Sequence, residues 1–119
     1  MLNSKQYDLE ERMVRFGERI VDLVKKINIT AINERIISQL VGSSGSMGAN
    51  YCEATEAESK KDFIHKIGIA KKEAKETKHW LRLLARTNPE HVDEIRELWK
   101  EVHELLLILS KSNSTARGK

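Results

Sequence analysis

The residues best suited to bind a ligand form a row of cations in the third quarter of the chain. Between Ser59 and Arg86 there are nine Lys/Arg against three Asp/Glu, a local net charge of +6. At about 100° per residue, five of these cations fall on one stripe that flanks the core face of a helix: Lys71, Lys75, Lys78, Arg82 and Arg86. Such a row predicts contacts with the phosphates of RNA or DNA. The alternative is a solvated face, partly neutralised by residues 90–111, which carry a net charge of −3.

Because aromatic residues are scarce near these cations, any binding should depend on the phosphate backbone and tolerate different base sequences. The opposite flank of the same helix carries four residues at spacings of four, three and four: Ile69, Glu73, Glu76 and Trp80. A tryptophan beside an isoleucine, outside the core seam, predicts a subunit interface. Three apolar residues near the C-terminus also favour a subunit interface: Leu98, Leu105 and Ile108. The alternative is a wider core within one chain.

The remaining reactive residues match no catalytic or metal-binding pattern. Glu76 and His79 form one Glu-x-x-His pair, whereas di-iron bundles need two such pairs and two further Glu. The other histidines are scattered and are predicted to lie on the surface: His65, His91 and His103. Cys52 is the only cysteine, so it forms no internal disulfide, and no nearby cation favours its thiolate. We therefore predict no enzyme activity, no metal and no cofactor.

Four long amphipathic helices should position these residues. Charged residues make up 33% of the 119, aromatic residues 5%, and there is one proline, which suits helices. The predicted helices cover about residues 8–27, 30–56 (starting near Thr30 or Asn33), 59–86 and 88–111. Their seams are Leu9, Met13, Phe16, Ile20, Leu23 and Ile27; Ile36, Leu40, Met47 and Ala54; Phe63, Ile67, Ala70, Ala74, Thr77, Leu81 and Leu84; and Val92, Ile95, Trp99, Val102, Leu106 and Leu109.

Short connections force neighbouring helices to be antiparallel, so the predicted fold is all-α, an up-down-up-down four-helix bundle. The bundle should occupy residues 1–111, and the polar residues 112–119 should be a disordered tail. Ser59 is a predicted helix cap, and Asn88-Pro89 should start the last helix. The glycine- and serine-rich stretch 41–49 is predicted to be helical, with small residues that let a neighbouring backbone approach. Without a signal sequence or a long apolar run, the predicted compartment is the cytoplasm, with no membrane contact.

Two segments carry a family resemblance. Residues 46–54, Ser-Met-Gly-Ala-Asn-Tyr-Cys-Glu-Ala, include Asn50 and Glu53 at the positions of a motif near a turn. Residues 62–84 begin with Asp62-Phe63 and end with Trp80-Leu81-Arg82-Leu83-Leu84. Together the chain from about 7 to 110 resembles the bacterial four-helix-bundle proteins encoded in intervening sequences of 23S ribosomal RNA genes. Glu73 departs from the pattern, which often has Ser there.

The resemblance implies homopentamers. It also implies a relation to the accessory variability determinant of diversity-generating retroelements, which is basic, binds nucleic acid and associates with a reverse transcriptase. Asn50 and Glu53 are expected to be buried, hydrogen-bonded and to tie the second helix to the following turn, with a binding role as the alternative. The predicted function is a non-enzymatic oligomeric scaffold that binds RNA or DNA. The alternative is an adaptor that docks a partner protein.

Overall fold

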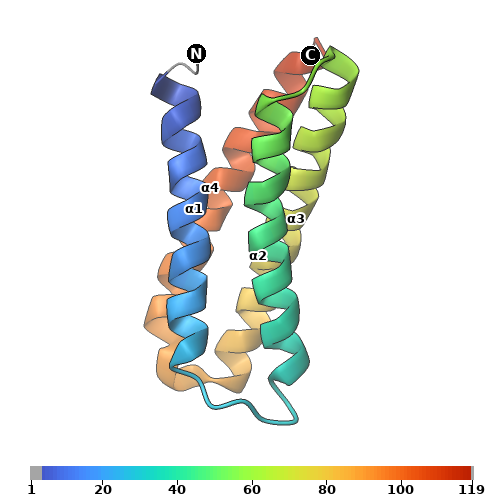
Figure 1. Ribbon diagram of the computed structural model, residues 1–119. Coiled ribbons are helices and arrows are strands. Elements are labelled where there is room, and N and C mark those ends of the chain that lie inside the picture. The colour runs from blue at the N-terminus through green and yellow to red at the C-terminus, as the bar shows by residue number, and fades with distance from the viewer. Residues whose placement is uncertain (1–3, 119) are drawn as a thin grey trace.

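The computed structural model describes residues 4–118, and the surroundings of side chains from residue 8, as four long helices side by side. Helix α1 spans Ser4–Lys25, α2 spans Glu34–Thr55, α3 spans Lys60–Thr87 and α4 spans Val92–Ala116. A 3₁₀ turn, η1, occupies Pro89–His91. Helices α1 and α3 run in one direction and α2 and α4 in the other (Figure 1). The predicted all-α, up-down-up-down bundle is confirmed.

The core lies along the common axis of the four helices. Each helix contacts two neighbours, in the order α1, α2, α3, α4 and back to α1, and α1 is joined to α4 most loosely. The largest side chains with under 2% exposure are Phe16, Ile20, Leu23, Leu40, Met47, Ile67, Leu81, Leu84, Ile95, Leu98, Leu105 and Leu109. Burying each of these contributes about 1.5–3 kcal/mol relative to exposure. Most of the predicted seam is therefore core, although Ile37 is buried where Ile36 was predicted, and Ile36 is half-buried.

A buried asparagine joins the two connections at one end of the bundle. Asn33 is 1% exposed and immediately precedes α2. Its Oδ1 accepts a hydrogen bond from the Thr30 N–H at 2.8 Å, and its Nδ2 donates to the Asn28 carbonyl at 3.0 Å and to Asn88 Oδ1 at 3.1 Å. Because Asn88 directly precedes η1, this one amide links the α1–α2 connection to the α3–α4 connection.

The helix ends differ from the sequence prediction at two places. Ser59 caps α3 as predicted, accepting from the Asp62 N–H at 3.0 Å. Pro89, however, opens η1, so α4 begins three residues later, at Val92. The prediction of a disordered tail is wrong for residues 112–116, which continue α4. Asn113 in this segment is buried, and its Nδ2 donates to the Ile64 carbonyl of α3 at 3.1 Å.

The glycine- and serine-rich stretch 41–49 is helical as predicted, but no neighbouring helix lies close to two of its glycines. Gly42 and Gly45 are exposed, and a Cβ atom at either position would meet nothing within 4 Å. A Cβ at Gly48 would lie 3.7 Å from Met13 Cβ, an ordinary contact. The proposal that these glycines let a backbone approach is therefore wrong for Gly42 and Gly45.

The close approach of α2 to α3 occurs at two hydroxyl groups instead. Ser43 and Thr77 are both buried, and their Oγ and Oγ1 atoms lie 2.8 Å apart. The Thr77 hydroxyl also lies 2.9 Å from the Glu73 carbonyl, and the Ser43 hydroxyl 3.3 Å from the Leu40 carbonyl. A buried hydroxyl without a partner costs about 1–3 kcal/mol. This pair therefore favours one register of α2 against α3.

The free space beside Gly42 and Gly45 leads to a prediction about stability. Replacing both in the variant Gly42→Ala/Gly45→Ala should raise the free energy of unfolding by about 1–2 kcal/mol, because each Gly in a helix interior costs up to about 1 kcal/mol against Ala. Urea unfolding followed by circular dichroism measures the change. The exposed Ala49 in the same helix provides the matched control, since Ala49→Gly should lower stability by about 1 kcal/mol. A double variant less stable than the wild type would contradict the open space found at both positions.

Candidate nucleic-acid interface

Two members of the predicted cationic stripe, Lys78 and Arg82, lie on the flank of α3 that faces α4. Lys75, Arg82 and Arg86 are exposed, and Lys71 and Lys78 are half-buried. From the first cation to the last the stripe extends about 22 Å along the helix, at 1.5 Å per residue. Lys78 contacts His103 and Trp99 of α4, and Arg82 lines a groove with residues of α4. Lys75 lines a pocket with Gln39 of α2.

Lys78 is engaged within the protein. Its Nζ lies 2.9 Å from His103 Nδ1 and 4.5 Å from the centroid of the Trp99 ring. An ammonium group can only donate, so Nδ1 accepts this hydrogen bond. The Trp99 and His103 rings are stacked, with centroids 5.2 Å apart and planes at 9°. The members of the stripe left for a ligand are called the open cations: Lys71, Lys75, Arg82 and Arg86.

The sequence analysis missed the contribution of α4 to this surface. Trp99 packs against the core as predicted and also lies beside Lys78. His103, which was predicted to lie on the surface, is half-buried and contacts Lys78. Arg96 is exposed and lines a groove with Arg82. The spacing of residues 96, 99 and 103 by three and four places them on one flank of a helix. That spacing was the available signal.

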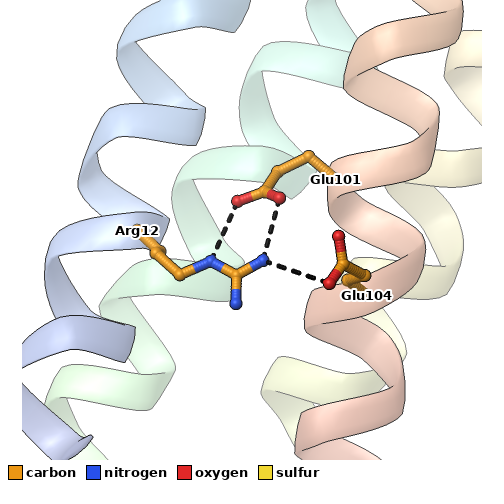
Figure 2. Close-up of polar contacts among 3 residues, drawn as sticks. All are labelled: Arg12, Glu101 and Glu104. Carbon is orange, nitrogen blue, oxygen red and sulfur yellow. Dashed lines mark hydrogen bonds and ion pairs between the residues drawn. The ribbon is translucent and has the colours of Figure 1, made fainter.

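Three acids of α4 contact cations of α1 or of the connection that follows it. Glu101 accepts two hydrogen bonds from Arg12 of α1, at 2.9 and 3.1 Å, and Glu104 lies 3.9 Å from the same guanidinium (Figure 2). Glu94 pairs with Lys26, beyond the end of α1. Within residues 4–118, no carboxylate forms an ion pair with any of the open cations. Glu94, Glu101 and Glu104 therefore lie toward α1, whereas Arg96 lines the groove toward α3.

The predicted interface residues lie on the other flank of α3. Ile69, Glu73 and Trp80 are half-buried, and Glu76 is exposed. Trp80 and Glu76 line a shallow pocket of about 310 Å³ together with Gln39 of α2. Burial, followed by repulsion from Glu76, raises the pKa of Glu73. Lys75 of the stripe and His79 line the same pocket. The two predicted surfaces therefore meet at Lys75 on α3, while Lys78 and Arg82 lie toward α4.

Two apolar residues assigned to self-association belong to the core of the single chain. Leu98 and Leu105 are both 0% exposed, so the wider-core alternative is correct for them. Ile108 is 36% exposed and remains on the surface. The discrepancy arises because the seam of α4 is wider than the narrow stripe of a two-helix contact.

The motif residues act within and between helices. Asn50 is half-buried and its Nδ2 donates to the Ser46 carbonyl at 2.9 Å, one turn earlier in α2, so it does not tie α2 to the following turn as expected. Glu53 is exposed rather than buried, and it pairs with Lys66 of α3 at 2.9 Å. Phe63 is half-buried and packs against the core.

Reactive groups elsewhere are few. Burial, followed by a hydrogen bond with Glu10, raises the pKa of the Cys52 thiol to about 11, which keeps it protonated at neutral pH. In the described part of the chain, no three His, Cys, Asp or Glu side chains are grouped so that they could hold a metal ion. None of the described helices has both the length and the apolar character needed to cross a bilayer.

A family model and a solved structure are similar to this chain. A family model described as 23S rRNA-intervening sequence protein matches residues 5–111. A crystal structure from Bacteroides thetaiotaomicron VPI-5482, of a protein with unknown function from the S23 ribosomal protein family, is similar with a TM-score of 0.76. The two chains are 34% identical, over 88% of this chain and 97% of the other. No curated protein matches. The resemblance predicted from the motifs is confirmed, and this chain belongs to the family of 23S rRNA-intervening sequence proteins.

Proposed function

We propose that this protein is a non-enzymatic, self-associating helical scaffold that binds the phosphate backbone of RNA or DNA through the open cations. One observation carries the proposal: Lys71, Lys75, Arg82 and Arg86 lie on one flank of α3 and have no carboxylate partner among the described residues. A row of about 22 Å is long enough to contact several successive phosphates of one strand. The absence of a metal-binding group in residues 8–118 and the protonated Cys52 thiol leave binding as the favoured activity.

The first test reverses two exposed cations. Lys75→Glu/Arg82→Glu should weaken binding of a labelled single-stranded RNA at least tenfold, because each reversal replaces a phosphate contact with repulsion. It should also reduce the slope of log K against log salt by about 1.4, for two contacts at about 0.7 each. Fluorescence anisotropy at several salt concentrations measures both.

Helix α1 offers a matched control with the same change in charge. Arg19 and Lys25 are exposed and form no ion pair with a described residue, so Arg19→Glu/Lys25→Glu should affect binding much less. Equal losses in the two variants would assign binding to the net charge of the protein rather than to the stripe. Thermal unfolding by circular dichroism checks that both variants fold.

Self-association is the second part of the proposal, with a pentamer as the expected assembly. The surface that supports it is the α2-facing flank of α3, where Trp80 and Ile69 are half-buried beside exposed Glu76. Leu83 of the same helix is 39% exposed. Trp80 lines a pocket with Gln39, Lys75, Glu76 and His79. A tryptophan in a pocket with a polar rim is typical of an interface anchor.

Light scattering of the purified protein tests the assembly. The wild type should have a mass of about five times the 13.7 kDa chain, and Trp80→Ala/Glu76→Lys should reduce it by removing the anchor and adding a like charge per subunit. The control is Val14→Glu on α1, which is 48% exposed. A monomeric wild type would contradict self-association, and dissociation by Val14→Glu alone would move the interface to the α1–α2 side.

A second candidate function is an adaptor that docks a partner protein. The observation that favours it is a groove of about 380 Å³ between α1 and α2, whose lining includes Met13, Val14, Gly17, Val41 and Gly48. Val14 and Val41 are 48% and 39% exposed. An apolar groove of this kind suits a helix of another protein. Pull-down from nuclease-treated lysate separates the two functions: an adaptor should retain one specific protein with the Lys75→Glu/Arg82→Glu variant, whereas a nucleic-acid scaffold should not.

A further inference from the structure

The surface beside the open cations contains a groove with an aromatic wall. It lies between α3 and α4, has a volume of about 300 Å³, and is lined by Leu81, Arg82, Ala85, Val92, Ile95, Arg96 and Trp99. This volume is at the lower end of the range for small-molecule sites. Five of the seven lining residues are apolar, and the two polar ones are arginines, one on each helix.

The Trp99 ring in this groove is held in place before any ligand arrives. His103 stacks on it with planes at 9°, and Lys78 Nζ lies 4.5 Å from its centroid while bonded to that histidine. The indole Nε1 is buried and has no acceptor among the described residues, so the accessible part of the side chain is hydrocarbon. Because His103 and Lys78 already contact the ring, a ligand can contact only the part of Trp99 that lines the groove. A ring that is already fixed loses little conformational entropy when another ring packs against it.

The charges around the ring specify the class of ligand. Arg82 and Arg96 line the groove from opposite helices, both are exposed, and neither pairs with a carboxylate in the described structure. Lys75 lies about two turns from Arg82 along α3, and Lys71 about one turn beyond that. A suitable ligand therefore combines a flat ring for the groove with a chain of negative charges spaced along α3. A polynucleotide strand has both features.

Duplex nucleic acid cannot fill this groove, because its bases are stacked and paired inside the helix. We propose that the α3–α4 groove holds one unpaired nucleobase against Trp99, so that this surface binds single-stranded RNA or DNA in preference to duplex. The proposal rests on the phosphate-binding function proposed above and adds a base contact to it. Stacking is tolerant of base identity, since every base has a π face, so the preference concerns strandedness rather than sequence.

Fluorescence gives a direct test, because the chain has only two tryptophans. In the variant Trp80→Phe, Trp99 is the only tryptophan. Oligo-U RNA and oligo-dT DNA of about twelve nucleotides should quench its emission as they bind. Duplex DNA of the same length and inorganic polyphosphate should bind with steep salt dependence and leave the emission unchanged.

Substitution of the ring supplies the second measurement, made by anisotropy in the same background. Trp99→Leu should weaken single-strand binding by roughly 5- to 100-fold and leave duplex and polyphosphate binding unchanged. Trp99→Phe, which keeps an aromatic ring, should retain part of the single-strand affinity. The quenching measurement needs no change at Trp99, so it decides the proposal even where Trp99→Leu fails to fold.

The outcomes separate this proposal from the one on which it rests. Single strands that bind no more tightly than duplex and leave Trp99 emission unchanged would overturn stacking, while phosphate binding would stand. No binding of oligonucleotides, duplex or polyphosphate at low salt would overturn both. Quenching by poly-glutamate as strong as by oligo-U would identify the groove as a peptide site and overturn the nucleobase assignment.

Discussion

Two acids of α4, Glu101 and Glu104, contact Arg12 of α1, whereas Arg96 of the same helix lines the groove toward α3, and the surface chemistry of the protein depends on this separation. The guanidinium group of Arg12 donates two hydrogen bonds to Glu101 and lies close to Glu104 (Figure 2). Surface ion pairs of this kind contribute up to about 1 kcal/mol each to stability. Their larger effect is on where the charge lies, since they hold the carboxylates of Glu101 and Glu104 on the side of α4 that faces α1. The α3–α4 surface is left with cations only partly screened by distant carboxylates, which strengthens its attraction for anions.

The cations can act together only if α3 and α4 keep one register. Asn113 of α4 donates a hydrogen bond to the Ile64 carbonyl near the start of α3, and Lys78 near the middle of α3 donates one to His103. A shift of α4 by one turn would break both contacts and leave the buried Asn113 amide without its partner, at a cost of about 1–3 kcal/mol. The C-terminal residues that composition predicts to be disordered therefore help to align the groove that contains Trp99.

Sequence reasoning recovered what depends on one helix at a time. Most positions of the seams and the Ser59 cap follow from spacing and local hydrogen bonding, and these are found. It failed where the answer depends on a neighbour. The position of Glu101 around its own helix does not reveal that Arg12 of α1 lies opposite. Glycines in a helix suggest that a neighbouring backbone comes close, but none does at Gly42 or Gly45. Polar composition predicted a disordered tail because it says nothing of the buried partner that Asn113 finds on α3.

The two flanks of α3 have different proposed uses, and these uses reinforce each other. If copies associate through the α2-facing flank of Trp80 and Ile69, the α4-facing flank stays open in every subunit. A closed ring then repeats the groove with cyclic symmetry. Each groove offers one stacked base and a few phosphate contacts, which alone give modest affinity. A strand that reaches two grooves binds the second at a high effective concentration, and avidity rises by about 10²- to 10⁴-fold without any new kind of contact. Loss of the subunit interface should therefore weaken the binding of long strands far more than the binding of short ones.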